Sequence, residues 1–158
     1  MTVDKGMINM NIRLVPYETA YKQGIFDFTA RCFAELGKSF EPAGRHAYYN
    51  DINASFEAFW CLLADDVVVG TVGLKRLDSE TAELKAMYLA AELRGRGLGR
   101  QMMNTVAAEA GKRGYKSIVL DSISSYHDAL RLYEKTGFVP IDRYNDNSYA
   151  DVFMKLEL

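Results

Sequence analysis

The feature that most constrains the fold is a glycine- and arginine-rich stretch, RGRGLGR, at residues 94–100. It follows a predicted strand, 81–89, and precedes apolar residues at helical spacing, which are Leu98, Met102, Val106 and Ala110. Glycine lets the backbone approach an anion closely, and the first N–H groups of a helix point toward such an anion. Three arginines add positive charge. The stretch therefore predicts a strand-to-helix turn that binds a phosphate-bearing ligand, against the plainer alternative of a turn with solvated arginines.

The glycine spacing argues against two common nucleotide-binding motifs. A Gly-x-Gly-x-x-Gly motif that starts at Gly95 would need glycine where Arg100 stands, and one that starts at Gly97 meets Met102. No Gly-Lys-Ser/Thr follows, so the stretch is not a P-loop. An oxidoreductase with a nucleotide cofactor is therefore disfavoured.

The remaining patterns predict an α/β (α+β) chain with the order β-α-α-β-β-β-α-β-α-β-β. Two β-rich runs joined by Asp65-Asp66 indicate a hairpin, and Ser125-x-x-Asp128 fits a capping box that opens a helix. The expected strands lie at 10–14 closed by Pro16, at 59–64, 67–74, 81–89 and 118–120, and in the closing segment that includes 152–158. The expected helices lie at 17–36, 42–52, from 98 to the glycines 111 and 114, and from 125 to 136.

Composition limits the class of protein and its partners. The 158 residues are 49% hydrophobic and 25% charged, which is typical of one globular domain spanning 1–158. The formal net charge of −2 argues against nucleic acid as a partner. Cys32 and Cys61 have no metal-site spacing, and His46 and His127 are solitary, so no metal is expected. The first six residues lack the apolar core of a signal peptide, and no apolar run reaches about 18 residues, so a cytoplasmic protein with no membrane partner is expected.

Three motifs in order resemble the GNAT superfamily of N-acetyltransferases. Arg94-x-x-Gly97-x-Gly99 is similar to the family's Arg/Gln-x-x-Gly-x-Gly/Ala signature, which binds the pyrophosphate of acetyl-CoA. Residues 82–89 resemble the family's central strand, and residues 129–138 resemble its Leu-Tyr-x-x-x-Gly-Phe segment. The closing residues 144–158 resemble a bacterial subgroup, so the likeness covers about 82–158.

This resemblance implies a fold and an activity. The fold is a central mixed, mostly antiparallel twisted sheet of six to seven strands flanked by about four helices. The activity is direct transfer of an acetyl group from acetyl-CoA to a primary amine of a small molecule or peptide, by a monomer or homodimer. The alternative is a module that binds acyl-CoA without catalysis. The resemblance places the acceptor pocket at about 26–59 and 144–151.

The resemblance also assigns roles to individual residues. Tyr133 would donate to the sulfur of CoA, and its alternative role is packing in the core. Glu83 is the candidate general base, because on an alternating strand it would share a face with Lys85, Met87 and Leu89. Its alternative roles are pairing with Lys85 or solvation, with water as the base. The residues implied at acetyl-CoA are Met87, Tyr88, Leu89, Arg94, Gly95, Arg96, Gly97, Leu98, Gly99, Arg100 and Tyr126.

Two departures from the family pattern affect these expectations. Tyr126 stands where family members often carry an asparagine that contacts the pantetheine arm. Ala90 and Ala91 stand near the place of a proline that usually follows the central strand. We nevertheless expect a bulge in strand 81–89, produced by other residues.

Overall fold

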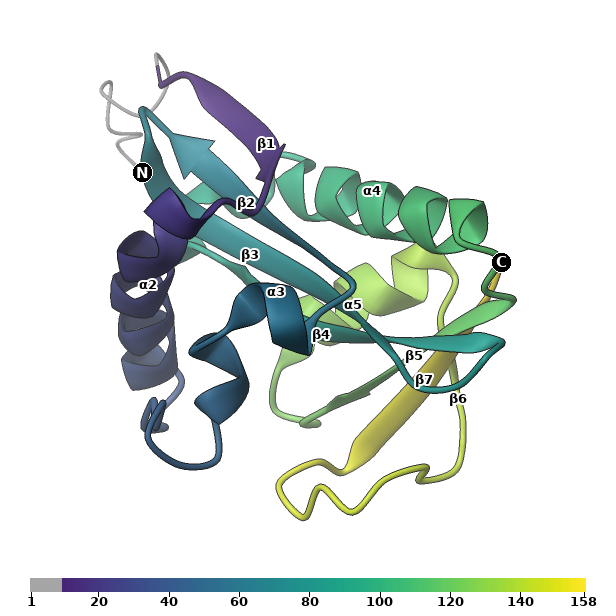
Figure 1. Ribbon diagram of the computed structural model, residues 1–158. Coiled ribbons are helices and arrows are strands. Elements are labelled where there is room, and N and C mark those ends of the chain that lie inside the picture. The colour runs from purple at the N-terminus through teal and green to yellow at the C-terminus, as the bar shows by residue number, and fades with distance from the viewer. Residues whose placement is uncertain (1–9) are drawn as a thin grey trace.

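The computed structural model describes residues 10–158 and contains a seven-stranded sheet in the order β1-β2-β3-β4-β5-β7-β6 (Figure 1). Only the β4–β5 pair is parallel. The mixed, mostly antiparallel sheet is as predicted. The prediction that residues 1–6 lack a signal peptide's apolar core concerns residues outside those that the structure describes. The strands are β1 Ile12–Pro16, β2 Ala58–Ala64, β3 Val67–Arg76, β4 Thr81–Leu89, β5 Ser117–Ser122, β6 Val139–Pro140 and β7 Val152–Glu157.

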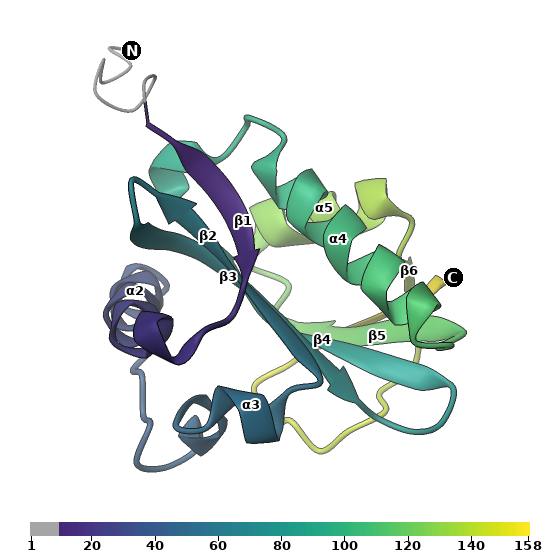
Figure 2. The same ribbon diagram turned by 45° about the horizontal axis from the view of Figure 1, so that its top comes forward.

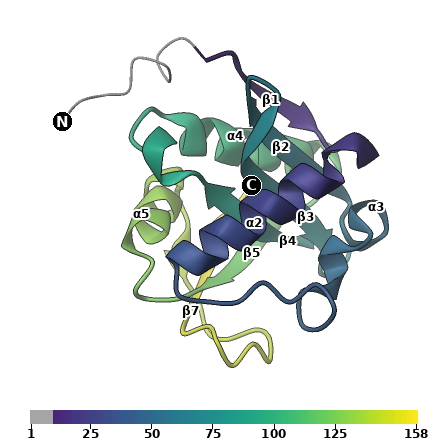
Figure 3. The same ribbon diagram turned by 90° about the vertical axis from the view of Figure 1, so that its left-hand side faces the viewer.

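Among residues 10–158 four α-helices flank the sheet, and the predicted element order is confirmed. Helix α2 lies against one face and α4 against the other, with α5 beside α4 (Figures 2 and 3). In the part of the chain that the structure describes, no helix is long and apolar enough to cross a membrane. The helices are α2 Lys22–Glu35, α3 Ile52–Ser55, α4 Leu98–Lys112 and α5 His127–Thr136, and the 3-10 turns are η1 Thr19–Tyr21, η2 Ala47–Tyr49 and η3 Ala91–Leu93.

Two local expectations were wrong. The helix expected at 42–52 is replaced by turns and η2, and α3 begins only at Ile52, where Asp51 accepts the Ala54 N–H at 3.1 Å. The capping box at Ser125 does not form, because α5 begins one residue later with Tyr126 as its N-cap. The Asp128 carboxylate instead accepts from Arg131 at 2.6 Å.

The hairpin between β2 and β3 forms as predicted. Asp65 and Asp66 have φ of +47° and +66°, the left-handed conformation that a two-residue hairpin loop needs. The Asn11 N–H donates to the Asp65 carboxylate at 3.0 Å, which ties the loop to the chain just before β1.

The expected bulge in the central strand is also confirmed, at Ala86. This residue has φ of +56°, and its carbonyl accepts from the Thr71 hydroxyl at 2.7 Å. Gly73 pairs with Lys85 while Thr71 pairs with Tyr88, so β4 has one more residue than β3 over this interval.

The bulge corrects the predicted face assignment of β4. Since directly paired residues share a face, Glu83, Lys85 and Tyr88 lie on one face with their partners on β3. Leu89 pairs with Gly70 and so lies on the opposite face. Simple alternation placed Leu89 with Glu83, which is wrong because the extra residue reverses the alternation.

The parallel ladder between β4 and β5 is short. Only Thr81, Ala82 and Glu83 pair with β5, although β4 continues to Leu89. Beyond Glu83 the two strands diverge. The backbone groups of later β4 residues that point toward β5 therefore have no strand partner on that side, which positions them for a ligand.

Candidate active site

The glycine- and arginine-rich turn joins η3 to α4 through two left-handed glycines. Gly95 and Gly97 each have φ of +79°, and a Cβ added at either would meet no atom within 4 Å. The backbone conformation therefore requires glycine there, and the space beside it is open.

The N-terminus of α4 presents unpaired donors to that space. Gly97 is the N-cap, no side chain caps the helix, and the first helical bond that reaches Gly97 comes from the Gln101 N–H at 3.1 Å. The N–H groups of residues 98–100 precede it and have no helical acceptor. Arg96 and Arg100 are exposed and take part in no ion pair with residues 10–158. This geometry suits a phosphate group.

Arg94 and Gly99 have structural contacts of their own. The Arg94 guanidinium lies 3.4 Å from the Asp128 carboxylate and donates to the Leu89 carbonyl at 3.3 Å, so it links the turn to α5 and β4. A Cβ on Gly99 would lie 3.0 Å from Leu132. Gly99 therefore allows α4 to pack closely against α5.

The β4 residues predicted at the cofactor lie at the opening between β4 and β5. Met87, Tyr88 and Leu89 are half-buried and follow the bulge. Burial raises the pKa of Tyr88 well above its usual value, and nearby tyrosines, including Tyr133 and Tyr126, raise it further.

Tyr133 lies on α5 and is 6% exposed. Its ring centroid is 5.8 Å from that of Phe138, so the packing contact expected of a core tyrosine is present. Burial, followed by the charge of Asp121, raises the pKa of Tyr133. The phenol is therefore protonated at neutral pH and able to donate a hydrogen bond.

Glu83 is 8% exposed and faces the same side of the sheet as Lys85. Its carboxylate accepts from the Tyr144 hydroxyl at 2.7 Å and lies 4.0 Å from the Lys85 ammonium. Burial and the hydrogen bond to Glu83 raise the pKa of Tyr144. The pairing with Lys85, which was the alternative role for Glu83, thus exists together with a tyrosine partner that was not predicted.

Three further residues of this neighbourhood were not assigned a role from the sequence, namely Asp121, Tyr144 and Lys38. Asp121, at the end of β5, accepts from Asn145 at 2.7 Å and from Asn147 at 3.3 Å. The Tyr144-Asn145-x-Asn147 pattern was the available signal, because its side chains fix the loop against Glu83 and Asp121. The third missed residue is Lys38, which has no sequence motif.

The two segments expected to form the acceptor pocket meet each other. The Arg45 guanidinium lies 3.9 Å from the ring centroid of Tyr149. His46 is buried beside Arg45, and its Nδ1 accepts the Glu41 N–H at 2.9 Å, which gives this histidine a structural role. Burial raises the pKa of the thiols of Cys32 to about 11 and of Cys61 to about 12, as expected of core cysteines.

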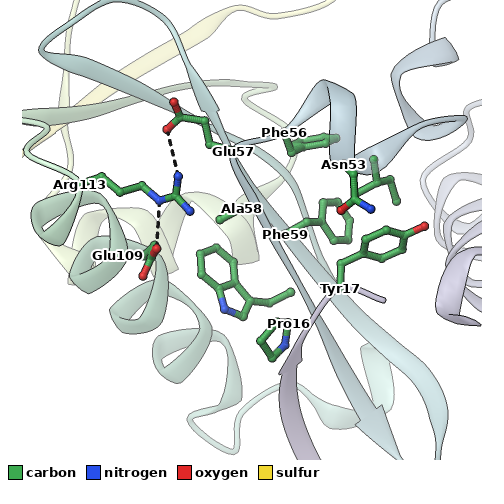
Figure 4. Close-up of a pocket in the computed structure, with 11 residues that line it drawn as sticks. Pro16, Tyr17, Asn53, Phe56, Glu57, Ala58, Phe59, Glu109 and Arg113 are labelled. Atoms are coloured by element: carbon green, nitrogen blue, oxygen red, sulfur yellow. Dashed lines mark hydrogen bonds and ion pairs between the residues drawn. The ribbon is translucent and has the colours of Figure 1, made fainter. Parts of the chain in front are cut away.

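A separate cavity of about 320 Å³ lies where β1 ends, between α3 and the C-terminal end of α4 (Figure 4). Its wall includes Arg113, which lies 2.9 Å from Glu109 and 3.8 Å from Glu57. None of the predicted cofactor-binding residues lines it. The described residues contain no group of three or more side chains suited to a metal ion.

Solved structures share this fold across nearly the whole chain. An acetyltransferase from Streptococcus agalactiae is similar with a TM-score of 0.85 and 23% identity, covering 93% of this chain and 98% of that one. A GNAT family acetyltransferase from Elizabethkingia anophelis, solved with acetyl-CoA bound, has a TM-score of 0.67 and 19% identity, covering 94% and 99%.

Sequence relatives agree with the structural neighbours. The N-acetyltransferase YsnE of Bacillus subtilis is 33% identical over 90 residues, covering 56% of this chain and 60% of its own. Human N-acetyltransferase 8B is 32% identical over 99 residues, covering 56% and 44%. The matches therefore span about half the length of these relatives. The model of the Acetyltransferase (GNAT) family matches residues 23–138, and the chain belongs to this family.

Proposed function

We propose that the protein is an acetyl-CoA-dependent N-acetyltransferase that transfers an acetyl group directly to a primary amine of a small molecule or peptide. The observation that carries the proposal is that two features lie next to each other, one suited to the amides of a ligand and one suited to an anion. The opened β4–β5 ladder leads, through η3, into the uncapped N-terminus of α4 with its two left-handed glycines. We further propose that residues 1–158 act as one domain in the cytoplasm, which the two free cysteines suit.

Binding of acetyl-CoA is assigned to the turn and to β4. The N–H groups of residues 98–100, with Arg96 and Arg100, would hold the pyrophosphate. Gly95 and Gly97 leave the room for it. Backbone groups of residues 87–89 that have no β5 partner would hydrogen-bond the pantetheine arm and the thioester oxygen.

Catalysis is assigned to Glu83 and Tyr133. Glu83 would take the proton of the attacking amine, directly or through water, and Tyr144 would hold the carboxylate in place. The Tyr133 hydroxyl would donate to the sulfur as negative charge develops there. The pKa of an ordinary tyrosine, ~10, already exceeds the ~8.5 of an ordinary thiol, and burial raises the pKa of Tyr133 further, so its main contribution is the hydrogen bond rather than complete proton transfer.

Turnover tests the proposal and separates it from a binding module without catalysis. A panel of amines, including amino acids, polyamines and peptide N-termini, is incubated with acetyl-CoA, and free CoA thiol is measured with a chromogenic disulfide. We expect amine-dependent CoA release for at least one class. A module without catalysis gives none, although acetyl-CoA still raises the melting temperature.

A matched variant ties the activity to the turn. Gly97→Asp places a carboxylate where the phosphate would sit and forces a side chain onto a left-handed residue. We expect it to abolish the melting-temperature rise given by acetyl-CoA, a stabilisation of about 2.7 kcal/mol at 100 times Kd. The control is Gly111→Asp, since Gly111 also lies on α4, away from the turn, and a Cβ added there would meet no atom within 4 Å. An unchanged response in Gly97→Asp contradicts the assignment.

A further inference from the structure

Lys38 has a backbone fixed by the end of α2. Gly37 adopts φ of +74°, the Gly37 N–H donates to the Ala34 carbonyl at 3.1 Å, and the Lys38 N–H donates to the Phe33 carbonyl at 2.9 Å. These two bonds form a Schellman motif, which turns the chain sharply. The position of Lys38 is therefore set by the helix end rather than by a loose loop.

The Lys38 ammonium lies inside a cage of aromatic rings. Its Nζ is 4.0 Å from the ring centroid of Phe33, 5.3 Å from that of Tyr88 and 5.7 Å from that of Tyr126. It donates to the Tyr88 hydroxyl at 3.1 Å. Among residues 10–158 no carboxylate lies within ion-pair distance of it. A half-buried lysine normally has such a partner, so the cage is an unusual setting.

Two walls of this cage belong to the proposed acetyl-CoA site. Tyr88 directly follows the bulge region of β4, and Tyr126 is the N-cap of α5. The cage therefore places a primary amine beside the strand whose backbone would hold the thioester. None of the catalytic steps proposed above uses this amine.

We propose that Lys38 is a self-acetylation site, whose amine takes the acetyl group from acetyl-CoA bound to the same molecule. The proposal rests on the proposed function. The neutral amine attacks the thioester carbonyl, a C–N bond forms, and the C–S bond breaks. The proton lost by nitrogen goes to the sulfur, so the products are Nε-acetyl-lysine and CoA with a free thiol. No other reactant is needed.

Burial and nearby positive charges favour the neutral amine that this step requires, whereas the cation–π contacts of the cage stabilise the ammonium. Burial lowers the pKa of Lys38 to about 8, the positive charges of Arg45 and Lys85 act in the same direction, and Asp121 opposes them. The titratable walls Tyr88 and Tyr126 are neutral at pH 7, because burial raises the pKa of each. At pH 7 roughly a tenth of Lys38 is then neutral, against about 0.04% of an exposed lysine with pKa ~10.4.

The modification would change the cage itself. Acetylation removes the charge that the three rings and the Tyr88 hydroxyl bind, and it adds a group that accepts as well as donates hydrogen bonds. The acetylated side chain therefore loses its cation–π contacts beside the proposed thioester site.

The test is acetylation of the purified protein by acetyl-CoA without any amine, followed by peptide mass spectrometry. We expect a 42-Da gain at Lys38 at least ~100-fold faster than at the exposed residues Lys112 and Lys135. The rate constant should not depend on protein concentration. Lys38→Arg keeps the cation and should lose the product, whereas Lys112→Arg should keep it. S-acetyl-N-acetylcysteamine, which lacks the nucleotide, should label Lys38 poorly.

Four results overturn the proposal. One is labelling of Lys38 no faster than of Lys112 while acetyl-CoA still raises the melting temperature, which leaves the proposed function standing. A second is a rate constant proportional to protein concentration, and a third is labelling of Lys38 by the short thioester as fast as by acetyl-CoA. The last is the absence of both labelling and a melting-temperature rise, in which case the proposed function fails too.

Discussion

Replacing Tyr133 by phenylalanine separates catalysis from packing. The ring is 6% exposed and packs against Phe138, and a phenylalanine ring in its place would keep this contact. No hydrogen bond to the Tyr133 hydroxyl is formed by the residues between 10 and 158, so its removal breaks no protein contact there. We expect Tyr133→Phe to change the free energy of unfolding by less than about 1 kcal/mol.

The expected effect on turnover is much larger. A donor aimed at developing charge in a water-excluded site contributes roughly 10²-fold, which corresponds to about 2.7 kcal/mol of activation free energy. Tyr133→Phe should therefore reduce kcat about 100-fold while the acetyl-CoA-dependent rise in melting temperature is kept. Tyr133→Ala should in addition lose about 3–5 kcal/mol of stability, because it leaves a cavity in the core.

The assay combines steady-state CoA release with thermal melts of both variants. A pre-steady-state measurement must establish that acetyl transfer, not product release, limits kcat. Wild-type turnover by Tyr133→Phe under that condition would refute the reasoning, since Tyr133 would then be a packing residue only. Because burial raises the pKa of Tyr133, wild-type activity should also not decline through its ionisation below about pH 10.

Three further variants test the surroundings of the site. Gly99→Ala places a Cβ 3.0 Å from Leu132, so we expect the free energy of unfolding to fall by about 1–3 kcal/mol in urea melts. The loss should be relieved in a Leu132→Ala background, and an unchanged midpoint contradicts the packing role. Tyr144→Phe removes the 2.7 Å hydrogen bond to Glu83, so kcat should fall several-fold with acetyl-CoA binding unchanged, and equal loss of binding argues against a positioning role. Lys38 has a pKa of about 8 when folded and ~10.4 when unfolded, so the unfolded state binds more protons between these values. The stability of wild type relative to Lys38→Met should therefore rise with pH over that range, and a flat difference contradicts the lowered pKa.

The sequence predicted the elements better than the contacts between them. Strand 81–89 was predicted with its observed bounds because turn residues precede it and the glycine- and arginine-rich stretch follows it. The bulge was expected, but its effect on Leu89 was not, because it depends on a left-handed Ala86 held by Thr71 on a neighbouring strand. Ser125 matched a capping pattern, yet in the structure the Asp128 carboxylate pairs with Arg131 one helical turn later and, across the fold, with Arg94.

In the candidate site, too, local features were predicted from the sequence and contacts between distant residues were not. Gly95 and Gly97 could be found because left-handed turns require glycine itself. Lys38 could not, and the Tyr144-Asn145-x-Asn147 pattern did not show its partners, since the Lys38–Tyr88 and Tyr144–Glu83 contacts each join residues more than 45 positions apart. No local pattern encodes such a contact.

The short ladder between β4 and β5 gives the sheet two strand edges in its interior. Exposed edges at the outside of a sheet invite other chains to add a strand, and this is a common route to aggregation. Here the unpaired edges, beyond Glu83 on β4 and beyond Val119 on β5, face each other. On its other side β4 pairs with β3, with the bulge at Ala86, and β5 pairs with β7. A second polypeptide would have to part the sheet to reach them, whereas a thin, amide-bearing ligand would not. The protein can therefore keep backbone hydrogen-bonding groups permanently unpaired for recognition without offering them to its neighbours.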